Sequence, residues 1–392
     1  MEMAPFPVLI RCGGQAVTDS GVSADAAVVH GGGQRELGEP TVPPPVLATI
    51  LASAGPPRPD DYGRGGNPTW AALERALGGI EDADAVVFSS GQAASMALML
   101  ALARDRDRIL LPRDGYYNAR VLAERLRPSG AVPVAVDLGD AAEVEREIAA
   151  GRTLLWAESP TNPLLRVADL ATLGELAAAA GAPMIVDNTV ATGLLQQPLD
   201  LGAVASLCSL TKSASGHSDV IAGAVMTRDA GLAAELRTWR TLGGGILGPM
   251  EAWLALRGLK TLPLRIERQS ASALAVAVHL AAHPRVTAVY YPGVGEPAAV
   301  ALARAQMPRG FGPLLSFEVD GTAADTDAVV LAARLIVPAT SFGGVESTWE
   351  RRDRWPGEAA PASLIRLSVG IEPAADLIAD IDHALALPEP SA

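Results

Sequence analysis

Three stretches of this chain, TLLWAESPTNP (residues 153–163), PMIVDNT (183–189) and VASLCSLTK (204–212), decide its fold. Each begins as a short apolar run, typical of a buried strand, and ends in polar residues that favour a turn. Helical patterns flank them at Ala141–Ala150 and Leu170–Ala180. Short strands that alternate with helices indicate a mostly parallel sheet covered on both faces.

The same alternation continues on both sides of these stretches. Short apolar runs predict strands at Ala85–Phe88 and Arg108–Leu111, and helical periodicity predicts helices at Ala71–Leu77, Gln92–Ala103 and Ala119–Arg127. The segment Gln92–Ala103 is apolar nearly all round, which indicates a buried helix. A second block is predicted to contain helices at Met250–Lys260, Ile266–His283, Thr326–Leu335 and Ala375–Leu387, and strands at Val286–Tyr291, Leu314–Val319 and Ile365–Val369.

The chain has 392 residues, enough for more than one domain. Residues 1–60 are rich in Pro and Gly and poorly periodic, and the prolines from Pro43 to Pro59 indicate an extended arm and not a helix. We predict a large domain over residues 61–256 and a small C-terminal domain over residues 257–392.

Composition excludes several classes of protein. A net charge of −13 argues against a nucleic-acid partner, because phosphate binding needs a positive field. Cys12 and Cys208 are the two cysteines, and their wide separation argues against a disulfide framework and a zinc site. No signal peptide and no apolar run of membrane-spanning length are visible, so we expect no membrane partner and a cytoplasmic location.

Polar residues follow four of the predicted strands. Glu158–Pro163, Asp187–Thr189 and Ser209–Lys212 end the three stretches quoted above, and Ser89–Gln92 lies between the strand at 85–88 and its following helix. In an open parallel α/β sheet, ligands bind at the carboxyl ends of the strands. An acid, an amide, a lysine and a helix N-terminus are therefore expected to meet in one crevice.

That set of groups suits pyridoxal 5′-phosphate (PLP). A helix N-terminus binds phosphate, a lysine with a lowered pKa forms an imine with an aldehyde, and a carboxylate keeps a pyridine nitrogen protonated. Taken singly, Asp187 also suits a helix cap, Asn162 a turn and Lys212 the solvated surface. Their joint order and spacing favour a PLP site in which Lys212 holds the cofactor.

Over residues 28–388 the chain resembles the Cys/Met-metabolism PLP-dependent enzymes, which include cystathionine γ-synthase, cystathionine γ-lyase, cystathionine β-lyase and methionine γ-lyase. This resemblance implies an aspartate-aminotransferase-like α/β fold (fold type I), with a mostly parallel seven-stranded sheet in the large domain and a smaller C-terminal α/β domain. The motifs that carry the resemblance are Tyr62-Gly63-Arg64, Asn67-Pro68-Thr69, Ser89-Ser90-Gly91, Ser159-Pro160-Thr161-Asn162-Pro163, Asp187-Asn188-Thr189, Ser209-Leu210-Thr211-Lys212, Gly216-His217-Ser218-Asp219, Ser341-Phe342-Gly343-Gly344-Val345-Glu346-Ser347 and Arg366-Leu367-Ser368-Val369-Gly370.

The resemblance also implies residue roles. Lys212, Tyr116 and Asp187 would be catalytic, and no metal is expected. The residues expected to bind the cofactor are Tyr62, Arg64, Ser90, Gly91, Gln92, Tyr116, Asn162, Asp187, Thr189, Ser209, Thr211 and Lys212. The residues expected to bind the substrate are Asn162, Ser341 and Arg366. Because the family uses Tyr62 and Arg64 across an interface, we expect a homotetramer, a dimer of dimers, with shared active sites.

The implied activity is α,γ-elimination or γ-replacement on an amino acid, as in a cystathionine γ-lyase-like carbon–sulphur lyase. Three positions depart from the family: Gln92 replaces a common Met, Asn118 the cysteine of methionine γ-lyases, and Thr340 a glutamate frequent in cystathionine γ-enzymes. The alternatives are therefore a halide or acyl-ester leaving group, or cystathionine γ-synthase, methionine γ-lyase or β-lyase activity. Lys212 and Arg366 disfavour a non-enzymatic PLP-fold protein.

Overall fold

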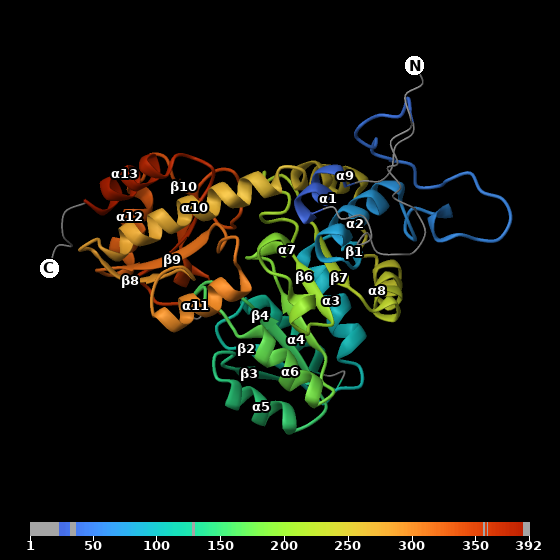
Figure 1. The fold of residues 1–392 in the computed structure, drawn as a ribbon, viewed down its shortest axis with the longest axis horizontal. Coiled ribbons are helices and arrows are strands. Elements are labelled where there is room, and N and C mark those ends of the chain that lie inside the picture. The colour runs from blue at the N-terminus through green and yellow to red at the C-terminus, as the bar shows by residue number, and fades with distance from the viewer. Residues whose placement is uncertain (1–22, 32–36, 128–129, 356, 359, 387–392) are drawn as a thin grey trace, which may run out of the picture.

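A computed structural model of the chain describes residues 23–31, 37–127, 130–355, 357–358 and 360–386. Two β-sheets organise these residues, one of seven strands and one of five. Figure 1 shows the larger sheet in the green and blue part of the molecule and the smaller sheet among the orange and red elements. The predicted architecture, a mostly parallel seven-stranded sheet with a smaller α/β unit after it, is confirmed.

The large sheet has the strand order β1-β7-β6-β5-β4-β2-β3. Its strands are β1 Asp84–Phe88, β2 Arg108–Pro112, β3 Val132–Val136, β4 Thr153–Glu158, β5 Met184–Asp187, β6 Ala205–Cys208 and β7 Gly223–Thr227. Strand β7 runs antiparallel to both neighbours, whereas the other pairs are parallel. The sequence did not predict β3 or β7, because β3 is an edge strand that contains Pro133 and β7 is buried throughout, without alternation.

Helices cover both faces of this sheet. They are α2 Pro68–Glu81, α3 Gly91–Leu102, α4 Tyr117–Leu126, α5 Ala141–Ala149, α6 Leu170–Ala179, α7 Thr192–Leu195, α8 Ala230–Gly243 and α9 Pro249–Leu259. Successive strand residues enter different cores: Leu155 and Val186 pack in one apolar cluster, and Leu154 and Ile185 pack in another. Because these strands are buried on both faces, their sequences are continuous apolar runs without alternation.

The predicted extended arm is wrong for one segment, because residues Ala24–His30 form the helix α1. The Ser23 hydroxyl caps this helix by accepting a hydrogen bond from the Ala26 amide, and α1 packs on α2 with Val28 buried. The prolines used for the prediction lie beyond this segment. In Figure 1 the blue segment of residues 37–67, before α2, loops away from the body of the molecule. Cys12 lies outside the described residues.

The small sheet has the order β10-β11-β12-β9-β8. Its strands are β8 Val286–Tyr290, β9 Leu314–Val319, β10 Val337–Pro338, β11 Thr348–Arg351 and β12 Leu364–Ser368, and its helices are α10 Leu262–Ala281, α11 Pro297–Gln306, α12 Ala323–Ala332 and α13 Ala374–Leu385. The long helix α10 runs from the side of the large sheet to the small one (Figure 1). The sequence did not predict α11, β10 or β11.

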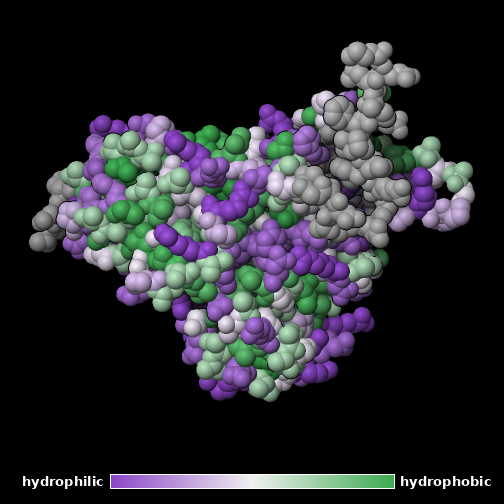
Figure 2. All heavy atoms as spheres, in the orientation of Figure 1, coloured by the Kyte–Doolittle hydropathy of each residue, from purple (hydrophilic) through white to green (hydrophobic). Residues whose placement is uncertain are grey.

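Apolar and hydrophilic residues intermingle on the face of the molecule shown in Figure 2. Within the described ranges, no helix combines the length and the apolar character needed to cross a membrane.

Candidate active site

A cavity of about 400 Å³ opens at the carboxyl ends of the large sheet's strands, and segments of the small unit close its other side. It is lined by Ser90, Gly91, Gln92, Tyr116, Asn162, Asp187, Thr189, Ser209, Thr211, Lys212, Ser341 and Arg366. The structure thus brings together every predicted site residue except Tyr62 and Arg64.

One end of the cavity is built to hold an anion. The side chain of Ser90 caps α3 by accepting a backbone N–H of its first turn at 3.0 Å, and the free amides of this helix end face the cavity. Ser209 packs against this turn, since a Cβ on Gly91 would lie only 3.0 Å from the Cβ of Ser209. The hydroxyl of Thr189 accepts the Ser209 amide at 2.9 Å, and Thr211 lines the same wall. Glycine at 91 therefore allows the helix end and the Ser209 loop to form one cradle.

Two carboxylates lie side by side at the strand ends. Glu158 of β4 and Asp187 of β5 are register partners in the parallel pair. Glu158 accepts the amides of Tyr116 and Asn162, each at 2.7 Å, whereas Asp187 accepts the Thr189 amide at 3.0 Å. Burial and the neighbouring Asp187 raise the pKa of Glu158, and burial also raises the pKa of Asp187. A cationic ring nitrogen beside Asp187 would offset that cost.

Lys212 sits at the junction of the two units. Its Nζ donates a hydrogen bond of 2.7 Å to the Oγ of Ser341 and lies 5.0 Å from the centre of the Phe342 ring. Burial, together with the positive charges of Arg366 and Arg352, lowers the pKa of Lys212 to about 8. A sizeable fraction of this amine is therefore uncharged, and thus nucleophilic, near neutral pH.

Arg366 is buried in the wall of the cavity near Lys212, since both side chains contact Ser341. Its Nη1 donates to Asn162 Oδ1 at 2.8 Å, and its Nη2 donates to the Ser341 carbonyl at 3.1 Å and to Glu350 Oε1 at 2.8 Å. Burial lowers the pKa of Arg366 to about 9, and Arg352 adds to this effect. The guanidinium remains charged at neutral pH and can pair with a carboxylate.

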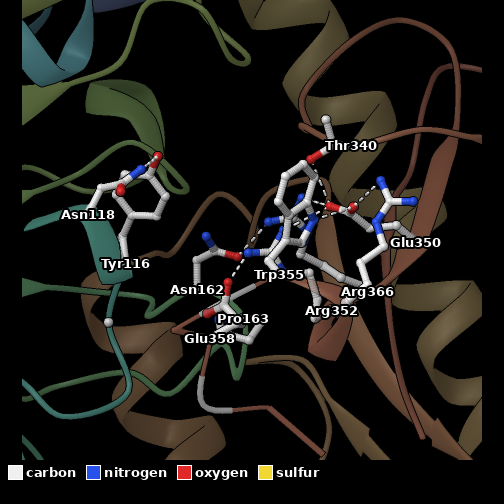
Figure 3. A network of polar contacts seen from close by, with 12 residues as sticks. Tyr116, Asn118, Asn162, Pro163, Thr340, Glu350, Arg352, Trp355, Glu358 and Arg366 are labelled. Atoms are coloured by element: carbon white, nitrogen blue, oxygen red, sulfur yellow. Dashed lines mark hydrogen bonds and ion pairs between the residues drawn. The ribbon is translucent and has the colours of Figure 1, made fainter. Parts of the chain in front are cut away.

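Sequence reasoning missed several residues of this site. Glu158 was visible as an acid at a strand end but received no role. Glu350 beside Arg366, and Arg352 and Trp355 in the cavity wall, carried no local signal, because only the pairing of β11 with β12 brings them to the site (Figure 3).

Tyr62 and Arg64 do not line the cavity of their own chain. The Tyr62 side chain is 54% exposed, and the guanidinium carbon of Arg64 lies 5.6 Å from its ring centre. Their predicted role in a neighbouring subunit therefore stays a prediction. In the part of the chain that the structure describes, no group of three or more His, Cys, Asp or Glu residues is placed to bind a metal.

The donor set fits PLP: a helix-end cradle for phosphate, a carboxylate at the end of β5 whose pKa is raised by burial, and a lysine whose pKa is lowered by burial. Fold and site together define a PLP-dependent enzyme of the α/β class. The chain belongs to the Cys/Met metabolism PLP-dependent enzyme family, whose model matches residues 48–386.

Individual relatives agree with this assignment. A putative cystathionine γ-lyase of Streptomyces coelicolor is 44% identical over 353 residues, which cover 88% of this chain and 89% of that protein. A cystathionine γ-synthase of Mycobacterium tuberculosis is 40% identical over 334 residues, covering 83% of this chain and 86% of that protein.

Among solved structures, apo CalE6, a methionine γ-lyase from Micromonospora echinospora, matches with a TM-score of 0.88 and 40% identity, covering 94% of this chain and 100% of that chain. The predicted cofactor, the amino-acid substrate class and the γ-elimination or γ-replacement chemistry are confirmed at the level of the family.

Proposed function

We propose that this chain eliminates a substituent from the γ-carbon of an α-amino acid, with replacement of that substituent as the second possible outcome. The observation that carries the proposal is the convergence of a lysine, a phenol and a buried arginine on one cavity. Lys212, Tyr116 and Arg366 supply a base, a proton donor and a carboxylate clamp.

Five groups of the chain would hold the cofactor. Backbone amides at Gly91 and Gln92, with the hydroxyls of Ser209 and Thr211, would hold its phosphate, and Asp187 would face its pyridine nitrogen. When bound, PLP accepts the negative charge that develops as Cα loses its proton.

The remaining groups would act on the substrate. Arg366 binds the α-carboxylate with Ser341 and Asn162 beside it, which fixes the direction of the Cα–H bond. Lys212 would take the proton from Cα, release it to the bound cofactor and so become neutral again, and then take a proton from Cβ, since both carbons would lie within its reach on one face. Tyr116 donates a proton to the departing γ-group.

Two engaged polar side chains bear on the nature of the γ-substituent. Asn118 Nδ2 donates to the Tyr116 hydroxyl at 2.7 Å, and the Thr340 hydroxyl donates to Glu350 at 2.9 Å. The polar groups of Asn118 and Thr340 thus already have hydrogen-bond partners within the protein. This favours a γ-substituent without a second amino-acid group, such as a thioether, a halide or an acyl ester.

The functional unit is proposed to be a homotetramer in which Tyr62 and Arg64 complete the site of a neighbouring subunit. Support comes from apolar side chains exposed in the single chain, among them Leu47 and Ile50 in the arm and Ile221 at the cavity. The cytoplasmic location and the domain limits given above stay predictions.

Isotope exchange in heavy water tests the proposed reaction. L-norvaline has no leaving group, so the enzyme should exchange deuterium into both its Cα and Cβ positions, which NMR resolves. The Lys212→Ala variant should exchange neither position. Exchange at Cα alone would contradict γ-elimination and support β-elimination.

A further inference from the structure

Five charged side chains form one cluster on the small-sheet side of the cavity: Glu350, Arg352, Arg354, Glu358 and Arg366, here named the arginine–glutamate cluster. Figure 3 labels all of them except Arg354. Four of them have side chains that are at most 5% exposed, whereas that of Arg354 is 48% exposed. Glu350 of β11 stands opposite Arg366 of β12 in the antiparallel pair. The sheet register therefore gives Arg366 a carboxylate partner before any substrate binds.

Glu350 is shared among several donors and is not reserved for Arg366. Its Oε1 accepts hydrogen bonds from Thr340 Oγ1 at 2.9 Å, Arg352 Nη1 at 2.8 Å and Arg366 Nη2 at 2.8 Å. Its Oε2 accepts one from Trp355 Nε1 at 2.9 Å and forms an ion pair with Arg354 Nη2 at 3.1 Å. A carboxylate shared among these five partners offsets the charge of Arg366 only in part.

Arg352 contacts both carboxylates of the cluster. One of its Nη atoms donates to Glu350 and the other to Glu358, and its buried Nε has no hydrogen-bond partner among the described residues. The four buried side chains are two guanidinium groups and two carboxylates, so their charges balance, and the third guanidinium, that of Arg354, is half exposed. Because the four balanced side chains are buried, salt screens the interactions among them poorly.

We propose that Arg352 sets the affinity of Arg366 for the substrate α-carboxylate, by drawing Glu350 toward itself and by balancing the charge of Glu358, so that the buried part of the cluster carries no net negative charge. Arg352 is in this view a positioning residue that acts through the two carboxylates. The inference rests on the proposed function, in which Arg366 binds the α-carboxylate.

A purely structural role makes a different prediction. Removing one partner from a buried ion pair destabilises a protein whatever the sign of the charge removed. Under that view Arg352→Gln and Glu358→Gln would harm the site alike. Under our proposal the two changes move carboxylate binding in opposite directions, and the double variant cancels them.

The test measures equilibrium binding to the PLP-loaded enzyme by calorimetry. The ligands are L-norvaline and L-norvalinamide, in which a neutral carboxamide replaces the carboxylate. Arg352→Gln should weaken L-norvaline binding by about tenfold, or about 1.4 kcal/mol. Glu358→Gln should tighten L-norvaline binding. The Arg352→Gln/Glu358→Gln double variant, with the original net charge, should return to within about threefold of the wild type. Binding of L-norvalinamide should change by less than about twofold throughout.

Two further variants serve as references. Arg351→Gln removes the same charge one residue earlier, where the guanidinium pairs with Asp327 of α12, and should leave the L-norvaline affinity unchanged. Arg366→Ala should weaken L-norvaline binding more than any other change. If it does not, the carboxylate clamp of the proposed function is wrong.

If Arg366→Ala weakens binding but Arg352→Gln does not, only the proposed role of Arg352 is wrong. That role is also wrong if Glu358→Gln weakens L-norvaline binding as Arg352→Gln does. It is wrong as well if the variants lose affinity for L-norvalinamide in parallel. If Arg352→Gln does not fold, Glu358→Gln can be compared with the double variant instead. That comparison still shows whether the loss of Arg352 weakens or tightens L-norvaline binding.

Discussion

Lys212 and Ser341, 129 residues apart in the chain, are joined by a hydrogen bond of 2.7 Å from Nζ to Oγ. Ser341 adopts a φ of 82°, a left-handed conformation that is uncommon outside glycine, and its carbonyl accepts a hydrogen bond from Arg366. One strained residue therefore touches both the proposed base and the proposed carboxylate clamp. Strain of this kind persists where the surrounding structure holds it and is common at functional sites.

Replacement of Lys212 by alanine is expected to abolish turnover and to leave PLP bound non-covalently. The lysine supplies the proton transfers, whereas the phosphate cradle at α3 supplies much of the affinity. Turnover should fall by more than about a thousandfold, and dialysis should remove PLP faster than from the wild type. Activity within about tenfold of the wild type would show that another lysine acts as the base.

Mixing two inactive variants should test the shared site. Tyr62→Ala and Lys212→Ala subunits are each expected to be inactive alone. After reassociation, a mixed dimer carries one site with both native residues, so up to about a quarter of the wild-type activity should return. Full activity of a monomer, measured by sedimentation of the active species, would rule out the shared site.

Asn118 is expected to tune the hydroxyl of Tyr116. Burial raises the pKa of Tyr116, and the hydrogen bond from Asn118 Nδ2 opposes this by stabilising the phenolate. Asn118→Asp replaces that donor by a negative charge, so the limb of the kcat/KM pH profile that belongs to Tyr116 should move to higher pH. Asn118→Leu is the neutral control and should give a smaller upward shift. An unchanged profile in the Asp variant would mean that Tyr116 does not titrate in the reaction.

The buried acid Glu81 predicts that the stability of the fold depends on pH. Glu81 lies beneath β6, where Ser206 Oγ donates to its Oε1 at 3.0 Å, and burial raises its pKa from 4.5 to about 8. The folded state therefore holds this proton more tightly than the unfolded state. Stability from this group is fully present below about pH 4.5 and is lost as the pH rises through about 8.

Glu81→Gln removes that dependence, because an amide keeps the shape but does not ionise. Urea unfolding should find the variant close to the wild type at pH 5 and more stable by over about 1 kcal/mol at pH 9. The quantity to compare is the free energy of unfolding of the variant minus that of the wild type at each pH, because this subtraction cancels the contribution of every other titrating group. The same value at pH 5 and pH 9 would show that Glu81 does not gain a proton on folding.

Most of the cofactor side of the site could be predicted from the sequence. Glu158, Asp187 and Lys212 each follow a short buried run, and parallel strands bring their carboxyl ends to one edge. Local order along the chain therefore fixes which side chains meet. The helix cap at Ser90 is likewise a local feature, since a hydroxyl and the amides of the next turn are neighbours in sequence.

The substrate side depended on the tertiary structure. Glu350 meets Arg366 because β11 and β12 pair antiparallel in one register, and a shift of one residue would turn Glu350 to the other face. Strand β11 has only four residues, too few for a clear sequence pattern, and Arg352 lies in the short 3₁₀ turn Arg352–Arg354 that follows it. Its partner Glu358 lies outside any helix or strand. The sequence by itself determined the cofactor class and the lysine that serves it. Only tertiary packing decided the charge around Arg366, because burial and register, which set that charge, arise between segments distant in the chain.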